Sequence, residues 1–267
     1  MIRAFYGIDK NPFSLEDITL LSQQQEVFDI LKVHSSQGGL CLLMGEPGTG
    51  KTMIKRAILH HAEKTTLVVH ISRTLHTYSN TIKILCEAFK TDYSGSHFKC
   101  EKRLIQEAFT LYNQGKTIIV IIDDAHLMSM DILRRLRLMF EDFPKNHNLI
   151  LMGESALLHN LALSVNQDIK SRVTYSVILK KLNPDDMHVF IERELDAVGL
   201  PHNVFTENAL ALIVRSSDGL LRYARNICIS CLVEAIRDQK RTIDIATVNR
   251  VLIQPHFRIE SDLEHFL

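Results

Sequence analysis

A glycine-rich stretch near position 50 limits this chain to a small group of folds. It fits the pattern G-x-x-x-x-G-K-[ST] in full, with Gly45, Glu46, Pro47, Gly48, Thr49, Gly50, Lys51 and Thr52 in order. Glycines in such a loop let main-chain amides turn inward around phosphate groups. An apolar run precedes the stretch and a helical pattern follows it, which is the context this motif requires. We therefore predict that Lys51 binds the β- and γ-phosphates of a nucleotide and that the Thr52 hydroxyl binds Mg²⁺.

Two acidic residues at the end of the most apolar run complete the predicted nucleotide site. Asp123 and Asp124 follow the isoleucine-rich residues 117–122. A carboxylate at the tip of a neighbouring strand can hold Mg²⁺ through water, and the next residue can polarise the attacking water. We assign Asp123 to the metal and Asp124 to the water. The alternative is a pair of solvated aspartates that cap the following turn.

The order of apolar segments predicts an α/β fold followed by helices. Short buried runs alternate with helical spacing up to about residue 180, which favours a five-stranded parallel sheet with helices on both faces. The expected strands are residues 39–44, 66–71, 117–122, 149–152 and 173–179, and the expected helices between them lie near residues 51–63, 75–89, 99–114 and 130–140. Helical patterns alone follow residue 182. We expect a nucleotide-binding domain over residues 1–180, an all-helical lid over 181–253 and a tail over 254–267.

A guanine nucleotide is the main competitor for the same phosphate loop. GTP-binding proteins need D-x-x-G after the metal-binding strand and N-K-x-D for the base. Here Asp123-Asp124-Ala125-His126 follows that strand, and no N-K-x-D occurs in the sequence. The spacing D-x-x-G occurs at residues 92–95, but it follows a helical pattern. ATP is therefore the expected nucleotide.

Composition indicates the cellular compartment and the kinds of partner to expect for this protein. The formal net charge is zero over 267 residues, so bulk charge favours neither nucleic acid nor membrane. The sequence has no run of about 18 apolar residues and no signal-peptide pattern, and we expect a cytoplasmic protein without a membrane partner. Five scattered cysteines indicate free thiols. Cys228 and Cys231 have redox-motif spacing, but their apolar helical context favours a role in the core.

The chain resembles the AAA+ ATPases of the ExeA/TniB/TnsC-like group, which contains transposition regulators and a secretion-system ATPase. The phosphate loop and helical lid carry the resemblance to the superfamily. The opening residues 5–13, Phe-Tyr-Gly-Ile-Asp-Lys-Asn-Pro-Phe, resemble the opening of the group. Residues 149–154, the Ser171-Arg172 pair and residues 219–222 also fall at matching places.

The resemblance implies roles for further residues. Arg172 would be an arginine finger that reaches the nucleotide of a neighbouring subunit, and Arg222 would be the lid arginine that senses the γ-phosphate. Phe13, with Ile8 and Pro12, would line the adenine pocket, and Glu154 or Ser155 would be the polar sensor after the fourth strand. The family usually has Glu where this chain has Asp124. The shorter side chain predicts slow ATP hydrolysis, since misplacement by ~1 Å can cost ~100-fold in rate.

The same resemblance implies a homo-oligomeric ring or filament that binds double-stranded DNA and recruits a transposase. The candidate DNA contacts are the loop residues Arg73 and Thr74 and three basic groups: Lys99, Lys102 and Arg103; Arg134, Arg135 and Arg137; and Arg237, Lys240 and Arg241. Each basic group is also explained by a solvated helix face. The alternative functions are a secretion-associated ATPase, a replication-type loader and a scaffold that binds ATP without cleaving it.

Overall fold

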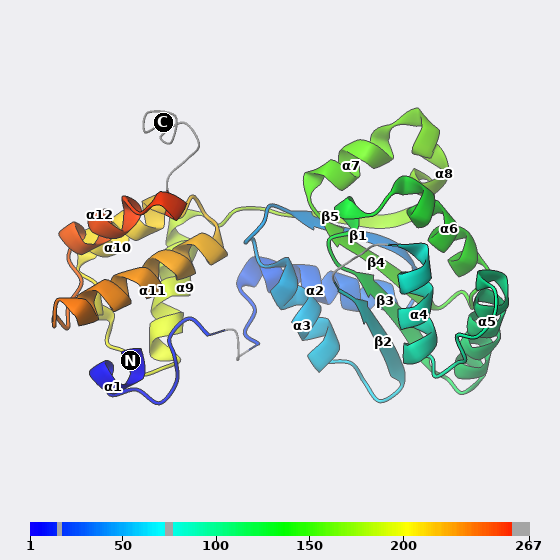
Figure 1. Cartoon of the computed structure of the whole chain (residues 1–267), viewed down its shortest axis with the longest axis horizontal. Coiled ribbons are helices and arrows are strands. Elements are labelled where there is room, and N and C mark those ends of the chain that lie inside the picture. Colours follow the sequence, from blue (N-terminus) through cyan, green and yellow to red (C-terminus); the bar gives the residue numbers. More distant parts are fainter. Residues whose placement is uncertain (15–17, 73–76, 258–267) are drawn as a thin grey trace. The chain divides into compact units, whose positions relative to one another are not determined.

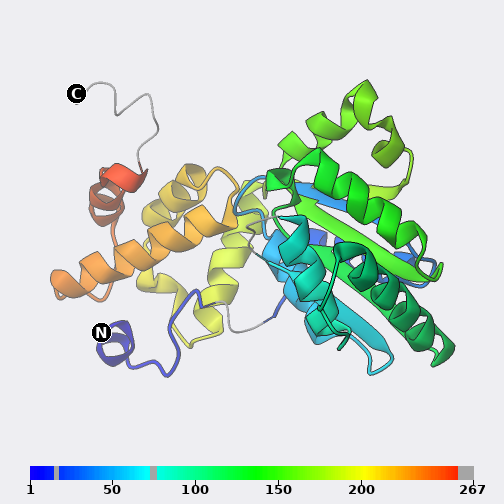
Figure 2. The ribbon, with the colours of Figure 1, turned by 45° about the vertical axis from the view of Figure 1, so that its right-hand side comes forward.

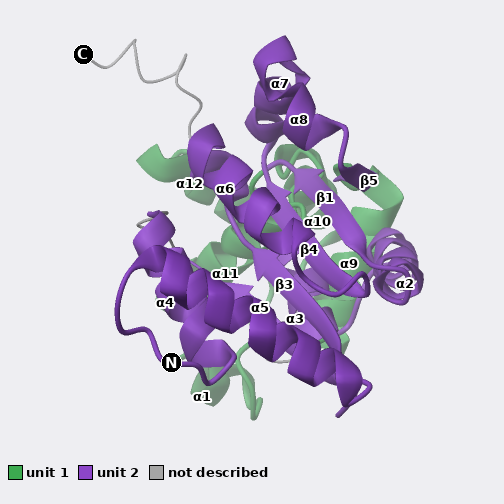
Figure 3. Cartoon of the chain, turned by 90° about the vertical axis from the view of Figure 1, so that its right-hand side faces the viewer, with its two compact units in different colours: residues 1–18, 47–50, 180–267 green, residues 19–46, 51–179 purple. Residues whose placement is uncertain are grey.

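The computed structural model describes residues 1–14, 18–72 and 77–257, and it divides into two compact units. Residues 19–46 and 51–179 form the α/β unit, and residues 1–18, 47–50 and 180–267 form the helical unit (Figure 3). We expected residues 1–180 as one domain. In the structure the first 18 residues group with the helices of the C-terminal part instead.

The α/β unit is built on a five-stranded parallel sheet, as the sequence predicts (Figure 1). The strands are β1 (Gly39–Gly45), β2 (Thr66–Ile71), β3 (Thr117–Ile122), β4 (His147–Gly153) and β5 (Val173–Leu179). Their order across the sheet is β2-β3-β4-β1-β5, and every neighbouring pair is parallel. Strands β1, β3 and β4 are buried along nearly their whole length, because helices cover both faces.

Each face of the sheet packs against its own set of helices. Helices α4 (Tyr78–Ala88), α5 (His97–Asn113) and α6 (Met130–Glu141) share one core cluster with alternate residues of the strands. These helices lie in front of the sheet in Figure 2. Helices α2 (Ser22–Ser35) and α3 (Lys51–His60) cover the opposite face, where Phe28, Ile58, Ile119 and Ile150 line one small pocket.

One long helix and several short elements of the α/β unit were not expected from the sequence. They are α2, α7 (Ser155–Ala162), α8 (Gln167–Lys170) and the 3-10 turns η1 (Ala125–Leu127) and η2 (Ser164–Asn166). Helix α2 begins at Ser22 without a side-chain cap of the usual Ser, Thr, Asp or Asn type. Its start therefore carries a weak sequence signal.

The helical unit contains α1 (Ile2–Tyr6), α9 (Pro184–Asp196), α10 (Glu207–Ser216), α11 (Leu221–Arg237) and α12 (Ile245–Leu252), with the 3-10 turns η3 (His202–Val204) and η4 (Pro255–Phe257). Local capping sets several of these starts: Asn183 accepts from the amide of Asp186, and Thr206 accepts from the amide of Ala209. A single β-bridge between Phe205 and Ile243 ties the loops around α10 and α11 together. Cys228 and Cys231 lie in the core of α11, as expected.

No helix among residues 1–14, 18–72 and 77–257 is both long and apolar enough to span a bilayer.

Candidate nucleotide site

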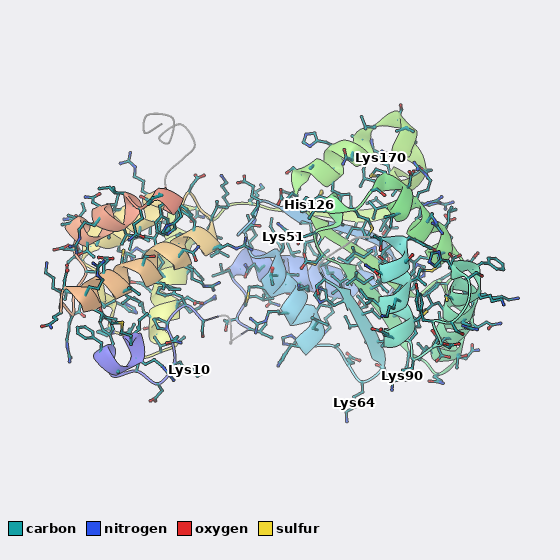
Figure 4. The ribbon with its side chains drawn as sticks, in the orientation of Figure 1. Lys10, Lys51, Lys64, Lys90, His126 and Lys170 are labelled. Atoms are coloured by element: carbon teal, nitrogen blue, oxygen red, sulfur yellow. The ribbon has the colours of Figure 1, made fainter. Side chains whose placement is uncertain are left out.

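The phosphate loop joins the end of β1 at Gly45 to the start of α3 at Lys51. Gly48 has φ +92° and Gly50 has φ +103°, backbone angles that residues other than glycine rarely adopt. The Lys51 ammonium, labelled in Figure 4, donates to the carbonyl oxygens of Gly45 at 2.6 Å and Glu46 at 3.0 Å. The loop thus has the backbone that turns amides toward an anion, and its lysine lies on the loop itself.

Asp123 lies where β3 ends, and several groups hold its carboxylate. The main-chain amide of Asp123 donates to Ile71 on β2 at 3.0 Å, which fixes the residue at the edge of the sheet. Its Oδ2 is 2.6 Å from the Lys55 ammonium on α3, and its Oδ1 accepts from the amide of Asp124 at 3.1 Å. The Nε2 atom of His70 lies 3.9 Å from Oδ2, within ion-pair distance but too far for a good hydrogen bond.

These neighbours keep Asp123 ionised. Burial by itself raises the pKa of the carboxyl, but His70, Lys55 and the amide of Asp124 outweigh it and hold the pKa well below its usual range. An ionised carboxylate, paired with the Lys55 ammonium, therefore lies at the edge of the sheet. An ionised carboxylate is the form that can orient the water ligands of Mg²⁺.

Asp124 is exposed and has a left-handed backbone, with φ 51° and ψ 35°. Aspartate tolerates this conformation better than most residues with a Cβ. It precedes the turn η1, and its carbonyl accepts from the amide of Leu127 at 2.9 Å. The site thus presents the Asp124 side chain on a tight turn rather than on a strand.

Glu154 and His126 form a second polar pair at the same edge. The amide of Glu154 donates to His126 Nδ1 at 3.4 Å, so a neutral ring carries its hydrogen on Nε2. That nitrogen lies 3.5 Å from Glu154 Oε1. The ring packs on Gly153, where an added Cβ would lie 3.2 Å from the His126 amide nitrogen. Ser155, the alternative sensor residue, begins α7.

Strand register brings the separate motifs of the α/β unit to one edge. Met44 pairs with Gly153, and Ile122 pairs with Leu151, so the ends of β1, β3 and β4 lie nearly level. Strand β4 lies between the other two. Gly45 at the end of β1, with Asp123 and Glu154 directly after β3 and β4, consequently lies at the carboxyl edge of the sheet, where α/β proteins bind their ligands.

Arg172 lies at the opposite edge of the sheet. It directly precedes β5, whose Val173 pairs with Leu40 near the start of β1. Five residue steps of β1 separate Leu40 from Gly45, where the phosphate loop begins, and they span about 17 Å at ~3.3 Å per residue. The side chain is 60% exposed, and its Nε lies 3.0 Å from Glu141 Oε1. An arginine so placed cannot reach the phosphate loop of its own chain.

Two other predicted site residues lie in the helical unit. The amide of Arg222, next to the start of α11, donates to the carbonyl of Gly48 at 3.3 Å. The added Cβ of an alanine at Gly48 would lie 3.0 Å from the Arg222 Cβ. Phe13 is buried and has φ 58°. Ile8 and Pro12 are also buried.

Some of the candidate DNA-contacting residues already form ion pairs or hydrogen bonds within the protein, and others are exposed to solvent. Arg134 contacts Asp168 at 2.9 Å and Asn166 at 3.0 Å, and Arg103 donates to the carbonyl of Ser94 at 2.8 Å. The Arg135 guanidinium lies 3.7 Å from the centre of the Tyr78 ring. Lys99 and Lys102 are exposed on α5, and Arg241 is also exposed. Three further basic residues form ion pairs: Arg137 with Glu141, Arg237 with Glu234, and Lys240 with Asp244. Arg73 and Thr74 lie outside the described residues.

These residues fit ATP and Mg²⁺. Gly48 and Gly50 have the positive φ angles expected of a phosphate-binding loop, Thr52 is exposed at the first turn of α3, and Asp123 is ionised at the carboxyl edge of the sheet. Bound Mg²⁺ would supply charge that stabilises the leaving phosphates. Lys51 would bind the phosphates, Thr52 and Asp123 would hold the ion, and Asp124 would orient water.

The sequence did not predict the roles of Lys55, His70 and His126. Lys55 follows Lys51 by four residues, so helical spacing alone puts it on the same side of α3. That spacing was a usable signal. His70 and His126 come from β2 and η1, and nothing in the sequence links either to its acidic partner.

Comparison with known proteins agrees with this geometry. Residues 33–161 match the AAA domain family. General secretion pathway protein A of Aeromonas hydrophila is 27% identical over 246 residues, which cover 88% of this chain and 45% of that protein. The chain thus spans less than half the length of the curated relatives it matches.

Solved structures share the fold at low sequence identity. Cdc6p from Pyrobaculum aerophilum superposes with a TM-score of 0.76 at 18% identity, over 97% of this chain and 75% of that one. The Aeropyrum pernix ORC1 protein in complex with DNA superposes with a TM-score of 0.68 at 17% identity, over 89% of this chain and 67% of that one.

The parallel sheet and the phosphate loop agree with the AAA domain that residues 33–161 match, and the solved structures show the same fold.

Proposed function

We propose that this protein is an ATP-dependent AAA+ regulator that assembles on double-stranded DNA and recruits or activates a transposase. Its ATP would bind with Mg²⁺ at the site around Lys51 and Asp123. The free, buried cysteines fit a reducing compartment, and we place the protein in the cytoplasm.

The observation that carries the proposal is the position of Arg172. It lies at the edge of the sheet opposite the phosphate loop, exposed and held by Glu141 through Nε. An arginine that acts on ATP from there must act on a neighbouring subunit. Identical subunits joined head to tail in this way form a ring or a filament. Oligomerisation is therefore part of the function.

DNA as the partner rests on three kinds of support. The opening residues resemble transposition regulators, the fold is shared with an ORC1 protein solved in complex with DNA, and Lys99 and Lys102 are exposed on α5. Contacts of lysine with phosphate would bind any duplex with little regard to sequence. The client of such an assembly would be a transposase.

A secretion-associated ATPase is the second candidate. Its support is the 27% identity with General secretion pathway protein A, which extends over 88% of this chain. Such an ATPase would have the same nucleotide site and would also form an oligomer, but it would act on a protein client instead of DNA. A replication-type loader keeps DNA and changes the client.

One imaging experiment separates assembly on DNA from assembly that serves a protein client, and ATP turnover of the same wild-type protein tests the scaffold. The protein is mixed with a slowly hydrolysed ATP analogue and random-sequence duplex DNA and is imaged by electron microscopy beside Lys51→Ala. Rings or filaments on DNA that the variant does not form would support the proposal. Nucleotide-dependent assembly that ignores DNA would favour the secretion-type reading, and wild-type protein that never turns over ATP would leave only a scaffold.

A further inference from the structure

Lys55 is a buried lysine that pairs with the predicted metal ligand Asp123. It lies on α3 one turn after Lys51, and its side chain is 10% exposed. Its ammonium is 2.6 Å from Oδ2 of Asp123, whose side chain is 17% exposed. Burying an ammonium is costly unless an opposite charge lies beside it. The two residues therefore hold each other in place.

The pair leaves Asp123 with both oxygens engaged. Oδ1 accepts from the amide of Asp124 at 3.1 Å, while Oδ2 contacts Lys55. His70 also faces the carboxylate, at 3.9 Å. The orientation of Asp123 is thus fixed by its surroundings without a metal ion.

The charge of Lys55 also has a consequence for metal binding. A divalent cation is held by several oxygen ligands and by their negative charge. Lys55 cancels the charge of Asp123, so a lone cation gains little at this edge of the sheet. The phosphates of a nucleotide supply new negative charge and further oxygen ligands.

We propose that Lys55 is a positioning residue that holds Asp123 in the place of a divalent cation, so that the cation binds only together with a nucleotide. The proposal rests on the nucleotide site described above. It predicts that charge at position 55, rather than hydrogen bonding, suppresses the binding of free metal.

The test measures binding of free Mn²⁺, a paramagnetic substitute for Mg²⁺, to the full chain by electron paramagnetic resonance without nucleotide. Lys55→Met removes the charge, Lys55→Gln removes it but keeps a hydrogen-bond donor, and Lys55→Arg keeps it. We expect Lys55→Met and Lys55→Gln to bind Mn²⁺ about tenfold or more tightly than the wild type, because a full charge near the ion is lost. Lys55→Arg should bind Mn²⁺ as weakly as the wild type. Adding Asp123→Asn to Lys55→Gln should abolish the gain in Mn²⁺ affinity.

Lys64→Met is the matched control, since Lys64 is an exposed lysine in the loop after α3 (Figure 4). It should leave Mn²⁺ binding at the wild-type level. If the Met variant does not fold, the Gln variant gives the same readout. Wild-type Mn²⁺ affinity in Lys55→Gln would overturn the proposal. Wild-type binding of Mn²⁺ with ATP is measured separately, so that failure of the nucleotide site itself is recognised.

Discussion

The main-chain amide of Arg222 donates a hydrogen bond of 3.3 Å to the carbonyl oxygen of Gly48. Both residues belong to the helical unit, which includes residues 47–50 of the phosphate loop. Gly48 and the predicted sensor arginine are thus coupled through the backbone, whatever the Arg222 side chain does.

Gly48→Ala should disrupt this contact and nucleotide binding together. The residue has φ +92°, and the new methyl group would lie 3.0 Å from the Arg222 Cβ. We expect a loss of roughly 1–3 kcal/mol in the free energy of unfolding and at least ~10-fold weaker ATP binding. Gly199→Ala is the control, because it has φ +74° and open space around it. It should show the backbone cost alone, and equal ATP binding in both variants would contradict the prediction.

Asp124→Glu should raise the ATP turnover number. The longer side chain restores the reach expected of the water-polarising group, and ~1 Å of misplacement can cost ~100-fold. Glutamate tolerates φ 51° less well than aspartate, so a melting temperature lower by a few degrees is expected. Steady-state turnover and thermal unfolding are measured on the same samples. Fast turnover by the wild type, in tens per second, would remove the reason for the variant.

Arg172→Ala should bind ATP normally and hydrolyse it slowly. The side chain is far from its own phosphate loop, so a defect in turnover must arise in the neighbouring subunit. Removing such an arginine costs ~10³-fold or more in related ATP and GTP sites. Mixing Arg172→Ala with Lys51→Ala, each inactive alone, should restore part of the activity. If the mixture stays inactive while mixed oligomers form, the arginine does not act in trans.

The five cysteines should resist thiol reagents in the native protein. All are buried, and burial raises the pKa of Cys41 and of Cys231 to about 12. At pH 8 the thiolate that reacts is therefore scarce, and reagents lack access as well. Titration with a disulfide reagent should find five thiols only after unfolding in guanidinium. Rapid native reaction of two thiols would reopen the redox interpretation of Cys228 and Cys231.

His147 should make the protein less stable as the pH falls below about 6.5. Burial lowers the pKa of the ring below its ordinary value of about 6.5, although the Pro144 carbonyl opposes the shift. As the pH falls through this range, His147 binds a proton in the unfolded chain before it does so in the native protein, so the free energy of unfolding decreases. His147→Phe, which preserves stacking on Phe140, should flatten the dependence. Urea midpoints at pH 7.5 and 5.5 give the comparison, and identical slopes would refute it.

Much of the fold can be predicted because each strand and most helices have a recognisable pattern within their own residues. The five strands are short apolar runs, and each begins and ends within a few residues of its predicted position. The helices around residues 51, 99 and 130 have clear periodicity, and Ser96 and Ser129 cap two of them. Helix α2 was missed because its sequence is mixed and its start lacks a polar cap.

The sequence by itself determined the chemistry at the carboxyl edge of the sheet: a glycine-rich loop, a lysine, a threonine and two aspartates after an apolar strand. These are short motifs, and local geometry fixes what each can bind. Only the tertiary structure decided which residues surround them. Lys55 meets Asp123, His126 meets Glu154, and Arg172 lies at the edge opposite the loop, because strand order and register bring distant segments together. No local pattern encodes such pairings, since they depend on how the whole sheet is assembled.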